Sequence, residues 1–200
     1  MKKLTALFIA ILFSASAAQA IEAGVAAPDF KTTDINGKAQ SISQYKGKIV
    51  VLEWTNPGCP FVKKFYEPGK MQELQKNAKA DDVVWLSINS SAEGKEGSLT
   101  ADAAKQVVAN AKSEAAAYIL DKDGSIGKSY RASSTPTMVV IDKEGKVAYF
   151  GAIDDKPTAK SSDIESANNY VTEAIAAVKA GKAVATPSTK SYGCGVKYAQ

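Results

Sequence analysis

Two cysteines are the residues of this chain best suited to chemistry. Cys59 lies in the stretch EWTNPGCPFVKKFY (residues 53–66), and Cys194 lies close to the C-terminus. A cysteine thiolate attacks disulfides and other sulfur or oxygen electrophiles. The chain has no histidine, which excludes Ser/His and Cys/His catalytic pairs and every imidazole metal site. The sequence therefore predicts thiol chemistry, with neither a metal nor a cofactor.

The position of Cys59 favours ionisation of its thiol. Pro60 suits the first position of a helix, and apolar residues follow at helical spacing as far as residue 66. A cysteine at such a helix start faces unpaired backbone N–H groups, and Lys63 and Lys64 add positive charge nearby. Two simpler interpretations stay open: Cys59 is only a buried or disulfide-bonded structural residue, and the two lysines form a solvated helix face.

The surrounding segments predict an α/β domain. The run KIVVLEW (residues 48–54) is typical of a central strand that is buried on both faces. An Asn36–Gly37 turn predicts an N-terminal hairpin between residues 31–35 and 38–42. Further strands are predicted at 82–89, 117–121, 137–142 and 147–151, and helices at 60–66, 70–79, 99–111 and 163–180. This order predicts a mixed β-sheet with helices on both faces.

The first twenty residues have the pattern of a secretory signal peptide. Lys2 and Lys3 precede an apolar run, and Ala18-Gln19-Ala20 offers a small-residue cleavage site. The prediction is a signal peptide over 1–20, one α/β domain over 21–180 and a tail over 181–200 that carries Cys194. The mature protein is predicted to be exported, to the periplasm, without a membrane segment. Its formal net charge falls from +4 to +2 after cleavage, which gives no case for nucleic-acid binding.

A second motif lies far along the chain from Cys59. Ser134-Thr135-Pro136-Thr137 stands immediately before a β-branched strand, where a proline is compatible with a tight or cis turn. Together with a cysteine between strand and helix, this motif resembles the thioredoxin superfamily. The likeness continues through LDKDGSIGKSY, STPTMVVIDKEGKVAYFGAIDD and the last helix, and is closest to extracytoplasmic redoxins of the peroxiredoxin-like, thiol-antioxidant type.

The resemblance implies a thioredoxin-like fold and roles for several residues. Cys59 corresponds to the attacking cysteine, and Thr135, Pro136 and Pro60 to groups that contact a bound thiol substrate. Glu53, six residues before Cys59, corresponds to a buried acid that could accept a proton during disulfide exchange. The alternative for Glu53 is an edge-strand carboxylate in water.

At these same motifs the chain differs from the thioredoxins and peroxiredoxins that it resembles. Val62 stands where thioredoxins have their second cysteine, so no disulfide can form within the motif. Peroxiredoxins orient peroxide with a threonine and an arginine, and Asn56 and Pro136 stand at those positions. The one arginine, Arg131, is displaced from there. These differences disfavour peroxidase activity.

Cys194 is the remaining candidate for a resolving thiol. Gly193 and Gly195 flank it and give the backbone freedom to approach the active face. A permanent Cys59–Cys194 disulfide that ties down the tail is an equally good interpretation, worth about 4–5 kcal/mol for so long a loop. Tyr192, Val196 and Tyr198 are candidates for docking the tail onto the domain.

Three functions follow from these observations. The first is a thiol–disulfide oxidoreductase acting on protein or small-molecule thiols and disulfides, together with a redox partner. The second is a thiol peroxidase, and the third is a non-catalytic binding or scaffold domain with a structural disulfide. Four aspartates are interpreted as turn residues rather than calcium ligands: Asp121, Asp123, Asp154 and Asp155.

Overall fold

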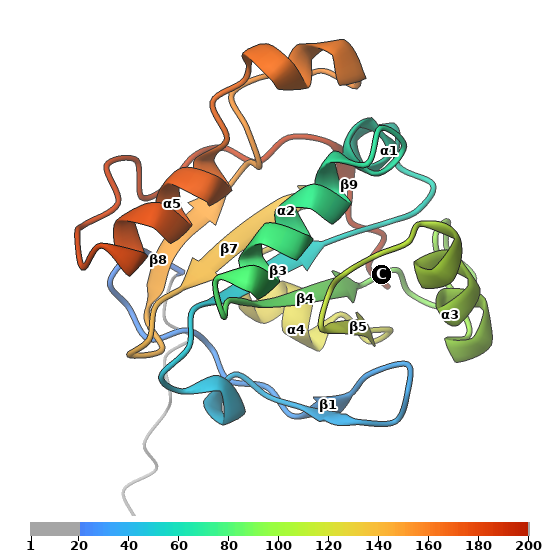
Figure 1. Ribbon diagram of the computed structural model, residues 1–200. Coiled ribbons are helices and arrows are strands. Elements are labelled where there is room, and N and C mark those ends of the chain that lie inside the picture. Colours follow the sequence, from blue (N-terminus) through green and yellow to red (C-terminus); the bar gives the residue numbers. More distant parts are fainter. Residues whose placement is uncertain (1–20, 200) are drawn as a thin grey trace, which may run out of the picture.

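The structure is a computed structural model that describes residues 21–199 (Figure 1). The predicted signal peptide lies outside the described residues. The strands are β1 (Thr32–Thr33), β2 (Ala39–Gln40), β3 (Val50–Trp54), β4 (Val84–Asn89), β5 (Ala117–Leu120), β6 (Ser134–Thr135), β7 (Thr137–Ile141), β8 (Val147–Gly151) and β9 (Cys194–Gly195). The α-helices are α1 (Pro60–Tyr66), α2 (Lys70–Ala80), α3 (Ala101–Asn110), α4 (Ser125–Ser129) and α5 (Tyr170–Lys179). Two 3₁₀ helices are η1 (Ser43–Tyr45) and η2 (Ser161–Ser166).

A five-stranded mixed sheet with the order β5-β4-β3-β7-β8 forms the centre of the domain. Strands β3, β4 and β5 run parallel, whereas β7 is antiparallel to β3 and β8 is antiparallel to β7. All five residues of β3 are buried, as expected for a nearly continuous apolar run in the middle of a sheet. The predicted mixed sheet is confirmed.

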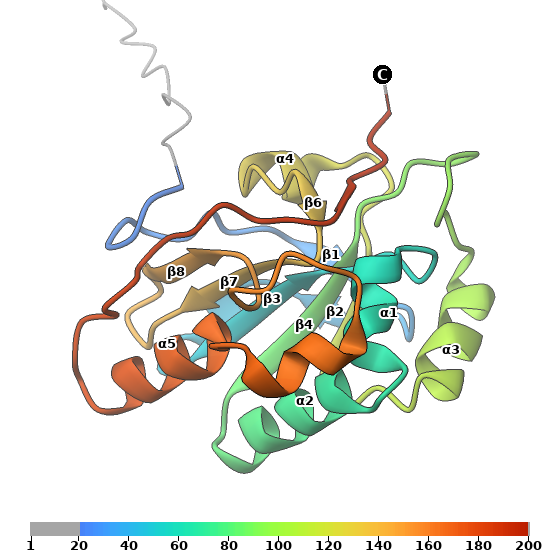
Figure 2. The ribbon, with the colours of Figure 1, turned by 90° about the horizontal axis from the view of Figure 1, so that it is seen from above.

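Helices cover both faces of this sheet, as predicted. Figure 2 shows α4 on one side and α2 and α5 on the other. Leu52 and Trp54 of β3 pack toward α4, while Val51 belongs to the cluster beneath α1, α2 and α5. This alternation follows from the two-residue period of a strand. Among residues 21–199, none of the helices is both long and apolar enough to cross a membrane.

Two predicted elements differ from the structure. The N-terminal hairpin is shorter than expected, because the Asp34 carboxylate accepts the N–H groups of Asn36 and Lys38 and starts the turn early. The predicted helix over 163–180 is wrong in its first part. There the chain forms η2 and then extends, and α5 begins only after Asn169, whose side chain caps the helix by accepting the N–H of Thr172 at 2.9 Å.

The tail after α5 returns across the domain to the active face. Figure 2 shows it passing along the β8 side of the sheet toward β6. The Tyr192 hydroxyl donates to Asp154, and the Tyr198 hydroxyl donates to the carbonyl of Ala132 at 2.7 Å. Between these two contacts, β9 pairs with β6. The proposed docking of the tail through its tyrosines is confirmed.

Candidate active site

Cys59 sits in the connection between β3 and α1, where it is the N-terminal cap residue of the helix. Pro60 occupies the first helical position, where its missing N–H group costs no hydrogen bond. The preceding loop is fixed by Asn56, whose carbonyl accepts the Cys59 N–H at 3.0 Å and whose side chain accepts the Gly58 N–H at 2.8 Å. The Cys59 side chain is fully buried, at 0% exposure.

The Thr135–Pro136 motif lies directly against Cys59. The peptide bond between Thr135 and Pro136 is cis, and the Cys59 thiol donates to the Thr135 carbonyl at 3.1 Å. Both residues of the motif are buried, whereas Pro60 is exposed. Residues separated by more than seventy positions in the chain therefore form one site, as the resemblance implied.

The tail brings Cys194 to the same place. Cys194 is the register partner of Thr135 in the β6–β9 pair, and its thiol and backbone hydrogen-bond to the Cys59 sulfur. Both cysteines are free thiols, Cys59 buried and Cys194 half-buried. Cys194 therefore lies beside Cys59, and no disulfide joins the two residues.

The hydrogen bond between the two cysteines shifts the pKa values of their thiols in opposite directions. Burial by itself would raise the pKa of Cys59, but hydrogen bonds with the side chains of Cys194 and Thr135 outweigh this effect, and the pKa is lowered. The pKa of Cys194 is raised, first by burial and then because its proton is held by Cys59. Cys59 is therefore the sulfur that ionises first and the better leaving group of the pair.

Glu53 is buried in the middle of β3, at 0% exposure, so the alternative of an edge-strand carboxylate in water is wrong. Its Oε2 accepts Trp85 Nε1 at 2.8 Å and Ser87 Oγ at 3.0 Å, and the Tyr66 hydroxyl lies 3.0 Å from Oε1. Gln75 adds a longer contact of 3.3 Å. Burial raises the pKa of the Glu53 carboxyl, and these hydrogen bonds only partly offset the effect.

Sequence reasoning missed the residues around Glu53, although a signal for two of them exists. Glu53 is directly opposite Ser87 in the parallel β3–β4 pair, and Trp85 lies two residues earlier on the same face. A strand alignment by the two-residue period would have grouped them. Neither sulfur is among the hydrogen-bond partners of Glu53 in the described residues.

The prediction that Lys63 and Lys64 form a solvated helix face is wrong for Lys64. Its side chain is 0% exposed and Nζ lies 3.0 Å from Asp154 Oδ2, in an ion pair whose other member is 1% exposed. Nζ also donates to the carbonyl of Lys156 at 2.8 Å and to the Tyr192 hydroxyl at 3.3 Å. The neighbouring Lys63 is exposed, as expected. Lys64 therefore links α1 to the tail.

The aspartates predicted as turn residues have further roles. Asp154 accepts the Lys156 N–H at 3.0 Å, as in a turn, but its main partner is the buried ammonium group of Lys64. Asp121 is buried, and it accepts the Ser90 hydroxyl at 2.6 Å and the Gly127 N–H at 2.8 Å at the start of α4. Among the described residues no group of acidic or cysteine side chains could hold a metal ion.

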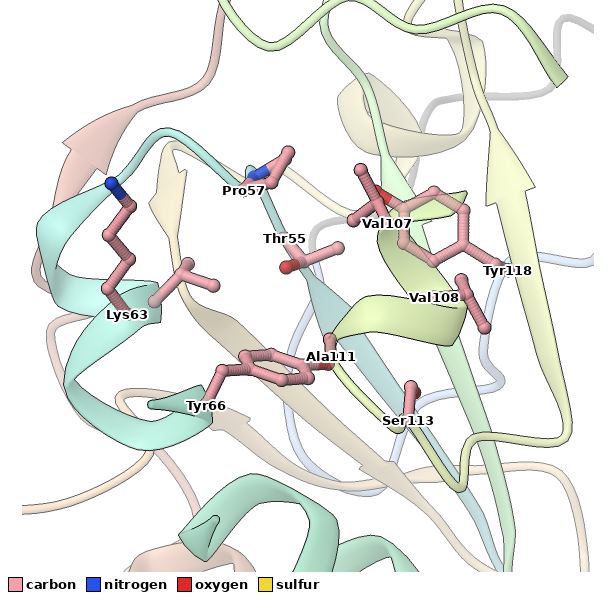
Figure 3. Close-up of a pocket in the computed structure, with 10 residues that line it drawn as sticks. Thr55, Pro57, Lys63, Tyr66, Val107, Val108, Ala111, Ser113 and Tyr118 are labelled. Carbon is pink, nitrogen blue, oxygen red and sulfur yellow. The ribbon is translucent and has the colours of Figure 1, made fainter. Parts of the chain in front are cut away.

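An apolar pocket of about 120 Å³ lies beside the active-site helix (Figure 3). Figure 3 shows Lys63 and Tyr66 of α1 on one side and Val107, Val108 and Ala111 at α3 on the other. Val62, at the position of a second motif cysteine, also lines it, whereas Cys59 does not. The replacement by valine therefore completes an apolar wall where thioredoxins carry a thiol.

Comparison with known proteins identifies the family. The family model described as Redoxin matches residues 22–169. The chain belongs to the Redoxin family. The match ends before the tail, so Cys194 lies outside the matched residues. Cys59 and the Thr135–Pro136 motif predicted a redoxin of the thioredoxin superfamily. This prediction is confirmed.

Named relatives of this redoxin have thiol chemistry in their descriptions. Thiol-disulfide oxidoreductase ResA of Bacillus thuringiensis is 32% identical over 127 residues, which cover 64% of this chain and 68% of the relative. Thioredoxin-like protein YneN of Bacillus subtilis is 29% identical over 150 residues, with coverages of 72% and 81%. The prediction of an oxidoreductase that acts on thiols is confirmed at this level.

Solved structures support the fold. A hypothetical protein from Sinorhizobium meliloti has a TM-score of 0.74 at 23% identity and covers 90% of this redoxin and 97% of its own chain. The exposed lipoprotein thioredoxin Etrx1 of Streptococcus pneumoniae has a TM-score of 0.51 at 31% identity, with coverages of 62% and 87%. The thioredoxin-like fold class is confirmed.

Proposed function

We propose that this redoxin is an exported thiol–disulfide oxidoreductase in which Cys59 is the attacking thiolate and Cys194 the resolving thiol. One observation carries the proposal: the tail places Cys194 in hydrogen-bond contact with Cys59, beside the Thr135–Pro136 loop. The pKa of Cys59 is lowered and that of Cys194 is raised, which assigns the first attack to Cys59.

The proposed cycle consists of two successive thiol–disulfide exchanges. The Cys59 thiolate attacks one sulfur of a substrate disulfide, and the other substrate sulfur leaves as a thiolate. Cys194 then loses its proton and attacks the Cys59 sulfur, which expels the bound substrate sulfur and leaves a Cys59–Cys194 disulfide. The substrate gains two electrons and the cysteine pair loses two. An external dithiol or a redox partner protein would return the pair to the reduced state.

Thr135, Pro136 and Pro60 are proposed to contact the substrate. The Thr135 carbonyl accepts the Cys59 thiol, Pro136 follows Thr135 in the same loop, and Pro60 directly follows Cys59 at the start of α1. Peroxide reduction receives no comparable support among the described residues. Asn56, at the position of the peroxiredoxin threonine, is engaged with Gly58 and with the carbonyl of Glu96, and Arg131 is exposed on the surface.

Export to the periplasm is proposed from the sequence of residues 1–20. A relative described as an exposed lipoprotein supports a location outside the cytoplasm. We expect the N-terminus of the purified mature protein to be Ile21. Terminal sequencing together with cell fractionation tests this, and an intact Met1 in a cytoplasmic fraction would reject it.

The reduction potential of the Cys59–Cys194 couple tests the function. We expect a reversible couple above about −270 mV, within the range of redox enzymes, measured by thiol trapping across a dithiothreitol gradient. A couple below about −300 mV would instead indicate a structural disulfide, and two free thiols at every potential would reject the proposed cycle. Each single-cysteine variant serves as a control, because neither can form the bond.

Glu53 is proposed to accept the proton that Cys194 releases, and its pKa gives a prediction for stability. A raised folded-state pKa means that the folded protein holds this proton more strongly than the unfolded chain does. The contribution of Glu53 to stability is therefore full below about pH 4.5 and is lost as the pH rises through the folded-state pKa. The slope in that window should approach about 1.4 kcal/mol per pH unit. In Glu53→Gln the free energy of unfolding should depend less steeply on pH over this window, as measured by urea unfolding over a pH series.

The exposed Glu67→Gln is the matched control for this measurement, and its slope should equal that of the wild type. If Glu53→Gln kept the wild-type slope, the carboxyl would not be the titrating group. A loss of exchange rate in Glu53→Gln with an altered pH–rate profile would support the proton-accepting role, whereas an unchanged profile would reject it.

A further inference from the structure

The tail is fastened to α1, the helix that begins directly after Cys59. Tyr192 precedes Cys194 by two residues. Its hydroxyl donates to the buried carboxylate of Asp154 and accepts a hydrogen bond from Lys64 Nζ at 3.3 Å. Lys64 belongs to α1, and neither side chain of its ion pair with Asp154 is more than 1% exposed. Hydrogen bonds to charged groups are stronger than neutral ones, so the chain is held firmly two residues before its second cysteine.

The aromatic ring of Tyr192 contacts the same helix. It packs edge-on against the ring of Phe61, with the two ring centroids 5.8 Å apart and the ring planes at 63°. Lys64 Nζ lies 5.5 Å from the centroid of the Tyr192 ring. Phe61 and Lys64 follow Cys59 by two and five residues. These contacts therefore fasten the tail to the short helix that positions the attacking sulfur.

The connection from Tyr192 to Cys194 is short and tightly constrained. Gly193 separates the two residues, and its φ angle of +129° is a conformation that residues with a side chain rarely adopt. A Cβ atom at Gly193 would lie 2.0 Å from the Thr135 carbonyl oxygen. Two residues of extended chain span at most about 7 Å, whereas the four from Cys194 to Tyr198 span up to about 14 Å. Tyr192 therefore restricts the position of Cys194 more closely than Tyr198 does.

This restriction matters most when Cys59 is bonded to a substrate sulfur. In the reduced protein the side chains of Cys59 and Cys194 share a hydrogen bond. In the mixed disulfide the Cys59 sulfur is uncharged and bonded to another sulfur, so it no longer holds the Cys194 thiol. Contacts outside the two cysteines, such as those of Tyr192, must then keep Cys194 within reach. A thiol held beside its target reacts at a high effective concentration, which falls when its chain segment is free to move.

We propose that Tyr192 is a positioning residue for Cys194, and that its place on the buried ion pair keeps this thiol ready to resolve the mixed disulfide. The proposal deepens the proposed function and rests on it for the chemistry. Tyr192 gains and loses neither electrons nor protons in the cycle, because it only limits the movement of Cys194. Without its hydroxyl the mixed disulfide should persist for longer, and an external thiol could attack it instead.

The first test follows the mixed disulfide directly. Reduced protein is mixed with one equivalent of dithiobis(nitrobenzoate), which Cys59 attacks to form an aryl mixed disulfide and one thionitrobenzoate. Cys194 then attacks the Cys59 sulfur and releases the second thionitrobenzoate. Acid quenching and mass spectrometry of the intact protein give the rate at which the adduct decays. In Tyr192→Phe this decay should be about tenfold slower, equivalent to about 1.4 kcal/mol, although the ring that packs on Phe61 is kept.

Tyr45→Phe is the matched control for this test. It also removes a tyrosine hydroxyl that donates a hydrogen bond, to Gln40 Oε1 at 2.6 Å, but from η1 and outside both α1 and the tail. Its adduct should decay at the wild-type rate. The slowing in Tyr192→Phe should be the same at every pH, because positioning changes how often the thiol is in place and not how readily it ionises. A slowing that disappeared at high pH would overturn the proposal.

The second test removes the charged partners of the Tyr192 hydroxyl. Its background is the double variant Lys64→Met/Asp154→Asn, in which no uncompensated charge stays buried. Adding Tyr192→Phe to this background should slow decay of the adduct by less than about threefold, because two changes that act through one interaction are not additive. A full tenfold slowing in this background would show that the hydroxyl acts through other groups, and would overturn the proposal.

The outcomes distinguish this proposal from the proposed function. If the wild type forms the adduct but never a Cys59–Cys194 disulfide, the cycle is rejected and the positioning role with it. The cycle stands and only the positioning role is rejected if the wild type resolves the adduct and Tyr192→Phe, folded by circular dichroism, does so equally fast. Equal slowing in Tyr45→Phe and Tyr192→Phe would likewise reject the positioning role alone.

Discussion

Replacing Cys59 with serine should lower the rate of disulfide exchange by at least about a thousandfold, because a serine hydroxyl is not ionised at neutral pH and cannot replace the thiolate. Hydrogen bonds with the side chains of Cys194 and Thr135 stabilise negative charge on the Cys59 sulfur and lower the pKa of its thiol. Serine is close in volume, so the fold should persist. The loss of exchange rate is measured with a model protein that contains a disulfide. The reaction is followed in both directions, as reduction of the disulfide and as oxidation of the reduced model protein.

Cys194→Ser is the matched control for this result. Cys59 in that variant should still attack the substrate, but the mixed disulfide should accumulate because the resolving thiol is missing. The trapped adduct is visible by mass spectrometry of the intact protein. Equal activity in both single variants would contradict the assigned roles. An adduct on Cys194 in the Cys59→Ser protein would reverse them.

Replacing Lys64 with methionine should destabilise the protein by about 3–5 kcal/mol, the usual cost of leaving one member of a buried ion pair without its partner. Asp154 would keep the Tyr192 hydroxyl and the Lys156 N–H as partners but lose the ammonium group. For a domain of this size the melting temperature should fall by about 6–20 °C. Thermal and urea unfolding measure both quantities.

The adjacent lysine supplies the control for that experiment. Lys63→Met removes the same charge from an exposed position one residue earlier and should change stability by less than about 0.5 kcal/mol. The double variant Lys64→Met/Asp154→Asn should recover much of the loss, because no uncompensated charge stays buried. Equal losses for Lys63→Met and Lys64→Met would show that the ion pair contributes nothing specific.

The sequence predicted the elements whose pattern is local. The apolar run of β3 is long enough to identify a central strand, and Pro60 after Cys59 marks the start of a helix. The interruption before α5 was missed, because the extension at Ala167 depends on contacts with the chain after β8. Those contacts join segments that are distant in sequence, and periodicity contains no information about them.

The candidate site was predictable only in part, for the same reason. Cys59, Thr135 and Pro136 lie at element boundaries that the sequence reveals. Lys63 and Lys64 are adjacent and chemically identical, and only the place of Asp154, ninety residues later, makes one of them buried. The glycine neighbours of Cys194 and the tyrosines of the tail suggested that the tail docks on the domain. Their contacts with Asp154 and Ala132 could not be predicted, because tertiary packing sets them.

The position of Cys194 near the end of the chain has a consequence for truncation by proteases. A chain cut after residue 169 would keep the whole Redoxin-matched segment, with Cys59 and the Thr135–Pro136 loop, but would lose Cys194. It would also lose the strand that pairs with β6 and the hydrogen bond that helps to lower the pKa of Cys59. Proteolytic loss of the tail would therefore leave a folded redoxin segment whose one remaining thiol has no internal partner.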